Sequence, residues 1–215
     1  MRKTILAAAL AAMMMTACSK SETPKPEVPP VQDDAQSLVV YFSRVGNTEF
    51  PEDMDAVSSA SLNLDDDGTL KGNAQMLAEW ISDESGSGLV EILAEEPYPV
   101  DYDETVEQAK QEQNDKNRPV LKSLPQDPEQ FDTIYLVFPN WWGDLPMPVY
   151  SFFDTYDLAG KNIYVFITHE GSRFSDTVET IQSLEPEASV YEVMDVSGGL
   201  VGDNEQTVRE WVKQH

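Results

Sequence analysis

Three short stretches of this chain are almost entirely apolar, and they constrain the fold more than any other feature of the sequence. They are Leu38–Phe42, Ile134–Phe138 and Ile163–Ile167, all rich in β-branched and aromatic residues. Strands with continuous apolar runs are covered on both faces, as in a parallel sheet flanked by helices. Two further β-rich stretches, Leu89–Leu93 and Ser189–Met194, bring the number of expected strands to five.

Helical patterns separate these strands. Apolar residues recur with helical spacing in the ranges 74–81, 145–156, 174–184 and 208–212, and a weaker, highly charged helix is expected from Asp103 to Lys116. The alternation of strands and helices predicts an α/β fold, a doubly wound, five-stranded parallel sheet with helices on both sides. In such sheets, ligands bind at the carboxyl ends of the strands, near the point where the strand order reverses.

The composition excludes several kinds of function. The chain carries 14 Lys and Arg against 39 Asp and Glu, a formal net charge of −25. This charge repels nucleic acid and favours a cationic or neutral partner. One cysteine and two histidines exclude a disulfide framework, a Cys-based metal site and a His-rich metal centre. We therefore expect no metal and no nucleic acid.

The first eighteen residues have the layout of an export signal. A positive start, Met1–Lys3, precedes an apolar run over 5–15 that is shorter than the roughly 20 residues of a membrane-spanning helix. Met15-Thr16-Ala17-Cys18 resembles the lipobox of bacterial lipoproteins, in which the Cys is acylated after cleavage. The alternative is an ordinary secretory signal with an incidental Cys.

This pattern predicts three regions. We expect a signal peptide at 1–17, a proline-rich flexible tether at 18–37 and a folded domain at 38–215. The domain would lie outside the cytoplasm in the cell envelope, attached to the membrane by a lipid at Cys18.

Polar, glycine-containing segments follow the first, third and fourth expected strands. Ser43–Thr48 has the glycine and hydroxyl residues of a loop that wraps a phosphate. Pro139–Gly143 contains two adjacent tryptophans suited to stacking on a flat ring, and Thr168–Ser172 is a short polar turn. Each segment alone is compatible with a plain turn, ordinary packing or an incidental histidine. All three, however, are expected to border one crevice.

The segments YFSRVGNT, FPNWWG and ITHEGS together resemble the flavodoxin-like proteins, specifically the branch with a THEG-type loop. The resemblance covers Leu38 to the C-terminus and implies a short-chain sheet of order 2-1-3-4-5 that holds FMN. It implies that the first segment wraps the FMN phosphate, the second covers one face of the isoalloxazine ring and the third lies on its other side. The implied cofactor contacts are Ser43, Arg44, Val45, Gly46, Asn47, Thr48, Pro139, Asn140, Trp141, Trp142, Gly143, Thr168, His169, Glu170, Gly171 and Ser172.

The sequence departs from the family pattern in two places. Val45 stands where the family usually has Ser or Thr, and Arg44 either compensates electrostatically or points to solvent. The segment from Glu49 to Gly72 separates the loop from the first helix, expected to begin near Asn73. Either this segment folds aside and the helix still points at the loop, or backbone amides alone hold the phosphate. Residues 60–68 predict a small hairpin within it, and their spacing excludes a calcium loop.

The resemblance leaves the activity open. Trp141 or Trp142 would stack on the ring, the peptide at Gly143 would accept a hydrogen bond from the flavin N5 in its one-electron state, and His169 and Glu170 would contact the ring edge or a substrate. The aromatic and acidic surroundings would lower the flavin potential. We favour an electron carrier that serves a redox partner protein or a small acceptor. The alternatives are an FMN-dependent NAD(P)H:quinone-type oxidoreductase and a flavin-free surface binding module.

Overall fold

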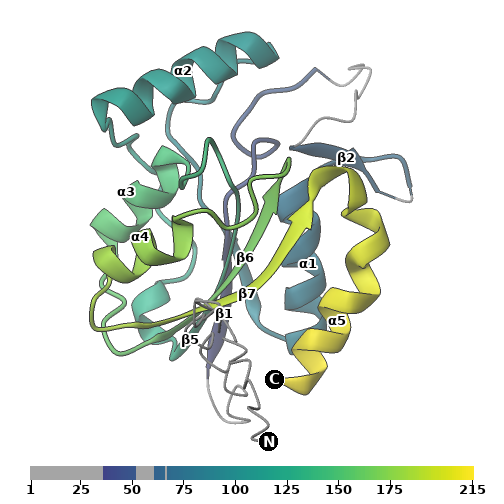
Figure 1. The fold of residues 1–215 in the computed structure, drawn as a ribbon, viewed down its shortest axis with the longest axis vertical. Coiled ribbons are helices and arrows are strands. Elements are labelled where there is room, and N and C mark those ends of the chain that lie inside the picture. The colour runs from purple at the N-terminus through teal and green to yellow at the C-terminus, as the bar shows by residue number, and fades with distance from the viewer. Residues whose placement is uncertain (1–35, 52–60, 66) are drawn as a thin grey trace, which may run out of the picture.

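The computed structural model describes residues 36–51, 61–65 and 67–215 of the chain. These residues form a five-stranded parallel sheet with helices on both faces (Figure 1). The strands are β1 (Ser37–Tyr41), β4 (Gly88–Glu91), β5 (Thr133–Pro139), β6 (Asn162–His169) and β7 (Ser189–Ser197). The expected signal peptide and Cys18, with nearly all of the expected tether, lie outside the described residues.

The order of the strands across the sheet is β4-β1-β5-β6-β7. Counted along the sheet strands alone, this is the expected order 2-1-3-4-5. After β1 the chain adds β4 on one side of it and then β5 on the other, so the strand order reverses between the neighbours β1 and β5. In such sheets, ligands bind in the crevice between the carboxyl ends of these two strands. All five expected strands are confirmed, with small differences at their ends. The largest is in β7, which continues to Ser197 rather than stopping at Met194.

Two hydrophobic cores, one on each face of the sheet, explain the continuous apolar pattern of the strands. Alternate residues of β1 serve opposite cores: Leu38 and Val40 pack on one face, and Val39 and Tyr41 on the other. Every residue of β5 is buried. The strands therefore show no polar face, which is why they read as unbroken apolar runs.

Five α-helices accompany the described part of the sheet. Figure 1 shows α1 (Asn73–Ser85) and α5 (Glu205–Gln214) on one face, and α3 (Met147–Thr155) and α4 (Thr177–Leu184) on the other. The remaining helix, α2 (Tyr102–Asp115), lies at the end to which the strands point. Only Thr105, Ala109 and Glu112 of α2 are buried, so this helix contributes little to the cores, to which it adds Ala109. Three 3₁₀ turns, η1 (Pro128–Gln130), η2 (Gly198–Leu200) and η3 (Gly202–Asn204), complete the set.

The segment between the first loop and α1 contains the expected hairpin. Strands β2 (Leu62–Leu64) and β3 (Leu70–Gly72) pair antiparallel, with Leu62 opposite Gly72. The first helix begins at Asn73, as the sequence predicted. Among the described residues, no helix is long and apolar enough to cross a membrane.

Candidate functional site

The loop after β1 adopts a tight turn against the start of α1. The amide of Asn47 donates to the carbonyl oxygen of Arg44 at 3.1 Å, and the amide of Val45 donates to Ser43 Oγ at 3.1 Å. Gly72, the residue before α1, lies so close to Ser43 that a Cβ at Gly72 would overlap the Ser43 hydroxyl. The N-terminus of α1 therefore reaches the loop despite the inserted segment. Of the two alternatives that the sequence left open, the structure has the one in which the helix begins beside the loop. An α-helix N-terminus in this position favours a bound anion.

A carboxyl group lies directly behind this loop. A Cβ on Gly46 would collide with the carboxylate of Glu91, the last residue of β4, so only glycine fits at this point. Burial raises the pKa of Glu91 to about 7; a hydrogen bond from Tyr41 opposes the shift, and the nearby Glu79 adds to it. One oxygen, Glu91 Oε1, is buried and has no hydrogen-bond partner among the described residues. Near neutral pH, the charge behind the loop therefore depends on the protonation of one side chain.

Asn47 holds the loop to the end of β4 rather than facing a ligand. Its Nδ2 donates to the carbonyl oxygens of Ser43 and Ile92, each at 2.9 Å, and its Oδ1 accepts from the amide of Ala94 at 2.8 Å. The side chain is thus fully used within the protein. The hydroxyl of Thr48, in contrast, is buried without a partner in the described structure.

Arg44 does not point to solvent, because only 3% of its surface is exposed. Its Nη2 donates to the carbonyl oxygen of Val100 at 2.9 Å and to Thr105 Oγ1 at 3.1 Å. The guanidinium also lies 5.3 Å from the ring centre of Phe50 and 5.7 Å from that of Tyr102. It therefore joins the first loop to the beginning of α2.

The loop after β5 is a tight turn that presents Trp142. The amide and carbonyl groups of Trp141 and Asp144 bond to one another at 3.0 and 3.1 Å. The two residues between them, Trp142 and Gly143, have φ values of 52° and 84°. Two positive φ values are the mark of a type I′ turn, and they explain the glycine at position 143.

Asn140 holds this turn in place. Its Oδ1 accepts from the amide of Gly143 at 2.8 Å, and its Nδ2 donates to the carbonyl oxygen of Arg173 at 2.7 Å. The second bond ties the loop after β5 to the loop after β6. The amide between Trp142 and Gly143 is thereby engaged, so any reorientation of that peptide must break a bond to Asn140.

The two tryptophans occupy different environments. Trp141 packs edge-on against Phe42 and Tyr98, with ring centres 5.4 and 5.7 Å away. Trp142 is 45% exposed, and Lys110 Nζ lies 6.0 Å from its ring centre. Trp142 is thus the tryptophan with a ring face available to a ligand, whereas Trp141 mainly supports the turn.

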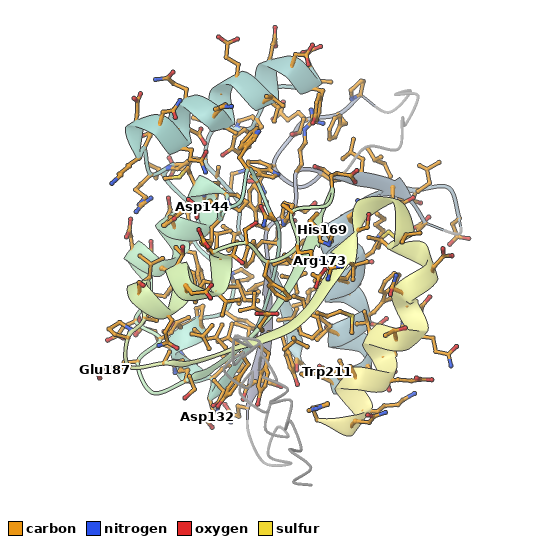
Figure 2. All side chains as sticks on the ribbon, viewed as in Figure 1. Asp132, Asp144, His169, Arg173, Glu187 and Trp211 are labelled. Carbon is orange, nitrogen blue, oxygen red and sulfur yellow. The ribbon has the colours of Figure 1, made fainter. Side chains whose placement is uncertain are left out.

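His169 is the last residue of β6 rather than a free loop residue. Its Nε2 lies 2.9 Å from Asp195 Oδ1, and its Nδ1 accepts from the amide of Gly171 at 2.8 Å. Both ring nitrogens are engaged within the protein, so His169 shapes the turn that carries Glu170 and Gly171. Figure 2 shows His169 and Arg173 at the same end of the molecule as Asp144, far from Asp132 and Glu187 at the opposite end.

One cavity of about 220 Å³ collects residues from all three loops. Its lining from the predicted set is Arg44, Pro139, Asn140, Trp141, Trp142, Thr168, His169, Glu170 and Ser172. The rest of the first loop does not line it. Pockets for whole ligands typically measure about 300–1,000 Å³, so this cavity has room for part of a cofactor-sized ligand.

Two buried polar groups in the cavity wall support a ligand there. Thr168 Oγ1 and Arg44 Nε are both buried and have no hydrogen-bond partner among the described residues. Buried polar groups are normally satisfied, so an unpaired donor beside a cavity indicates a missing polar partner. A ligand with polar ring edges would supply such partners, and the exposed face of Trp142 would supply a stacking surface.

Sequence reasoning missed the contribution of α2. Tyr102, Thr105, Val106 and Ala109 all line the cavity. The charged pattern of this helix gave no sign of a site. The one available signal was an aromatic residue, Tyr102, at the start of an otherwise polar helix. Within the described ranges, no group of His, Cys, Asp or Glu side chains is arranged to hold a metal ion.

The chain was compared with known proteins. A family model described as flavodoxin matches residues 64–215, which leaves the loop after β1 outside the match. A protein from Bacteroides uniformis ATCC 8492 is 24% identical with a TM-score of 0.62, over 83% of this chain and 98% of its own. One from Bacteroides eggerthii DSM 20697 is 22% identical with a TM-score of 0.58, over 84% and 97%.

A third solved structure, a flavoprotein in complex with FMN from Lactobacillus acidophilus NCFM, is 19% identical. Its TM-score is 0.53, and the match covers 80% of this chain and 99% of that one. The search of curated proteins gave no match. At these identities the solved structures support the fold.

Proposed function

The chain belongs to the flavodoxin family, and on this premise we propose that it binds FMN and transfers electrons outside the cytoplasm, attached to the membrane through Cys18. The family match covers most of the folded region, and one solved structure of the same fold is a complex with FMN. Flavin would supply the redox chemistry, and the protein would set its position, its access to partners and its electrostatic surroundings.

The observation that carries the proposal is the cavity at the carboxyl ends of β1, β5 and β6. It combines an exposed tryptophan face with two buried polar groups that have no partner among the described residues, and Arg44 links it to the loop beside the N-terminus of α1. Trp142 would stack on the ring, and Thr168 and Arg44 would provide polar contacts. Ser43–Thr48 would hold the phosphate.

The choice of electron carrier over reductase rests on charge and on sequence. With a net charge of −25, the chain disfavours the pyrophosphate of a nicotinamide cofactor, and no part of the sequence resembles a nicotinamide-binding fingerprint. The same charge favours a basic partner protein. A reductase activity predicts that NADPH alone bleaches the bound flavin, whereas a carrier requires a separate reductase.

The full-length protein, expressed in a bacterial host and extracted from its membranes, tests flavin binding. We expect a yellow protein with absorbance near ~450 nm, the general flavin signature, and release of FMN on denaturation. The Trp142→Ala variant should retain less flavin, whereas Trp80→Ala, which alters a tryptophan of the α1 core, is the matched control. A colourless protein whose fluorescence does not respond to added FMN would overturn the proposal.

The lipid anchor has a separate test. Cys18→Ser should leave the protein unable to carry the lipid, so it should move from the membrane fraction to the soluble fraction of the envelope. Ser19→Ala is the matched control, because it alters the neighbouring residue without removing the thiol. Equal membrane association of wild type and Cys18→Ser would disprove acylation at this position.

A further inference from the structure

For Arg44 the sequence left two positions open, one that compensates for Val45 in the phosphate loop and one in solvent. This residue belongs to the loop Ser43–Thr48, which the family resemblance assigns to the phosphate. Yet Arg44 is the member of that loop that lines the ring-sized cavity, together with Trp142 and Thr168. The positive charge of the loop is thus directed away from Gly46 and toward the ring end of the site.

The guanidinium is held in this direction by one of its nitrogens. Arg44 Nη2 donates to the carbonyl oxygen of Val100 and to Thr105 Oγ1, and it lies 3.4 Å from the carbonyl oxygens of Pro99 and Asp101. The rings of Phe50 and Tyr102 lie near the guanidinium. Because these partners come from the segment leading into α2, Arg44 also fixes the beginning of that helix over the cavity.

A second donor of the guanidinium, Nε, is not used by any described residue. Arg44 Nε is buried without a hydrogen-bond partner, and no carboxylate in the described part of the chain forms a salt bridge with this side chain. Burial lowers the pKa of Arg44 and the nearby Tyr102 and Asp101 oppose this shift, so the arginine stays cationic. A buried cation with an unused donor is costly unless a ligand supplies an electron-rich acceptor.

We propose that Arg44 binds the ring system of the flavin rather than its phosphate, donating from Nε to a ring oxygen, and that it stabilises the reduced ring more than the oxidised one. The inference rests on the proposed function. A reduced flavin carries more negative charge on its ring than an oxidised one, so a buried cation beside the ring favours reduction. This effect opposes the lowering of the potential expected from the acidic surface.

Two ligands distinguish the ring from the phosphate. FMN and riboflavin share the ring system, but only FMN carries a phosphate. Their dissociation constants would be measured by quenching of flavin fluorescence for the full-length wild type, Arg44→Met and Arg44→Lys. Arg118→Met is the matched control: Arg118 also lies over an aromatic ring, 4.2 Å from the centre of Tyr150, but outside this cavity.

We expect Arg44→Met to weaken both FMN and riboflavin by about tenfold or more, since a charge-assisted hydrogen bond is lost. The fold-losses of FMN affinity and of riboflavin affinity should agree within about twofold. Arg118→Met should bind both flavins as tightly as the wild type. Loss of FMN affinity alone would assign Arg44 to the phosphate and overturn the inference. Unchanged binding of both flavins by Arg44→Met would also overturn it.

The midpoint potential separates binding from a merely structural role. If Arg44 only held α2 in place, its loss would weaken oxidised and reduced flavin equally and leave the potential unchanged, which would overturn the inference. We expect Arg44→Met to weaken the binding of reduced flavin more than that of oxidised flavin. Each tenfold difference between these two losses lowers the midpoint potential by about 30 mV. Arg44→Lys, which keeps the charge, should show a smaller shift.

The outcomes also separate this inference from the proposed function. A wild type that binds neither flavin overturns the proposed function and the inference with it. A wild type that binds both, with an Arg44→Met variant of equal affinity and potential, overturns the inference alone. Hydrogen exchange of residues 98–116, measured in parallel, reports whether α2 is still docked in each variant.

Discussion

The two ends of the candidate site are built in opposite ways. At the end near β1, most side chains of the loop are engaged within the protein: Asn47 ties it to β4, and Ser43 accepts from Val45. At the other end, Trp142 is exposed, and Thr168, a residue of the cavity wall, has a buried hydroxyl without a partner among the described residues. The comparison teaches that the loop expected to bind phosphate is mainly a rigid backbone turn. Apart from the buried oxygens of Thr48 and Glu91, the groups of the site that lack a partner in the described structure lie at the ring end.

This difference in construction also appears in the electrostatics. Glu91 lies behind Gly46 at the phosphate end, whereas Arg44 lines the cavity at the ring end. We therefore expect the ring contacts to supply more of the binding energy than the phosphate contacts. Three sets of substitutions and one pH series test that expectation, in order of decreasing expected effect.

The first test separates the two tryptophans. Trp141→Ala should reduce the free energy of unfolding by about 3 kcal/mol, because its ring packs against Phe42 and Tyr98. Trp142→Ala should change it by less than about 0.5 kcal/mol, as for an exposed site, while weakening flavin binding. Urea denaturation measures the first effect, and flavin titration the second. A strong loss of stability in Trp142→Ala would contradict the division of roles.

The second test loosens the ring end alone. Asn140→Ala removes the bonds that join Gly143 to Arg173 and should destabilise the fold by about 2 kcal/mol. Flavin affinity should also fall, because the turn that presents Trp142 loses its support. Asn117→Ala is the control, since the side chain of Asn117 is exposed. Equal unfolding midpoints for the two variants would show that Asn140 does not hold the turn.

The third test disturbs the phosphate end. A methyl group at Gly46 would collide with the Glu91 carboxylate, so Gly46→Ala should displace the loop. We expect FMN affinity to fall about tenfold, equivalent to about 1.4 kcal/mol, while riboflavin affinity changes much less. The double variant Gly46→Ala, Glu91→Ala should recover FMN binding, because the obstacle is removed. Equal losses for both flavins would show that the loop also supports the ring.

The smallest expected effect is a dependence on pH. Because the pKa of Glu91 is raised from 4.5 to about 7 in the fold, its protonated form stabilises the protein below pH 4.5, and this stabilisation is lost as the pH rises to about 7. The groups around it are the neutral Tyr41, which donates to its Oε2, and the charged Glu79, which pairs with Lys71.

Relative to Glu91→Gln, the free energy of unfolding of the wild type should therefore fall by about 1 kcal/mol between pH 5 and pH 8. This is less than the full pKa shift would give, because Glu91 keeps some contact with solvent. Urea denaturation of both proteins at each pH measures this difference. Binding of the FMN phosphate should weaken over the same range in the wild type alone, because ionised Glu91 repels it. Parallel pH profiles for the two proteins would remove Glu91 from the account of the phosphate end.

Much of the fold follows from the sequence for a simple physical reason. Strands covered on both faces must be apolar throughout, so β1, β5 and β6 were visible as runs such as Ile134–Phe138. The alternation with helices then fixed the class of fold. The segments that contain Gly46 and the two tryptophans were visible because short-range backbone demands, such as the positive φ of Gly143, restrict the residues that fit.

Other features depended on contacts between residues far apart in the chain. Nothing near Arg44 in the sequence shows that its guanidinium bonds to Val100 and Thr105, and nothing near Gly72 shows that it touches Ser43. The placement of α2 over the cavity has the same origin. The sequence by itself determined the sheet, the strand ends and the residue types gathered there, because backbone conformation and burial restrict which residue type each position accepts. The tertiary structure alone decided which polar groups are used internally and which stay free, because that depends on the partners that folding brings within hydrogen-bond distance.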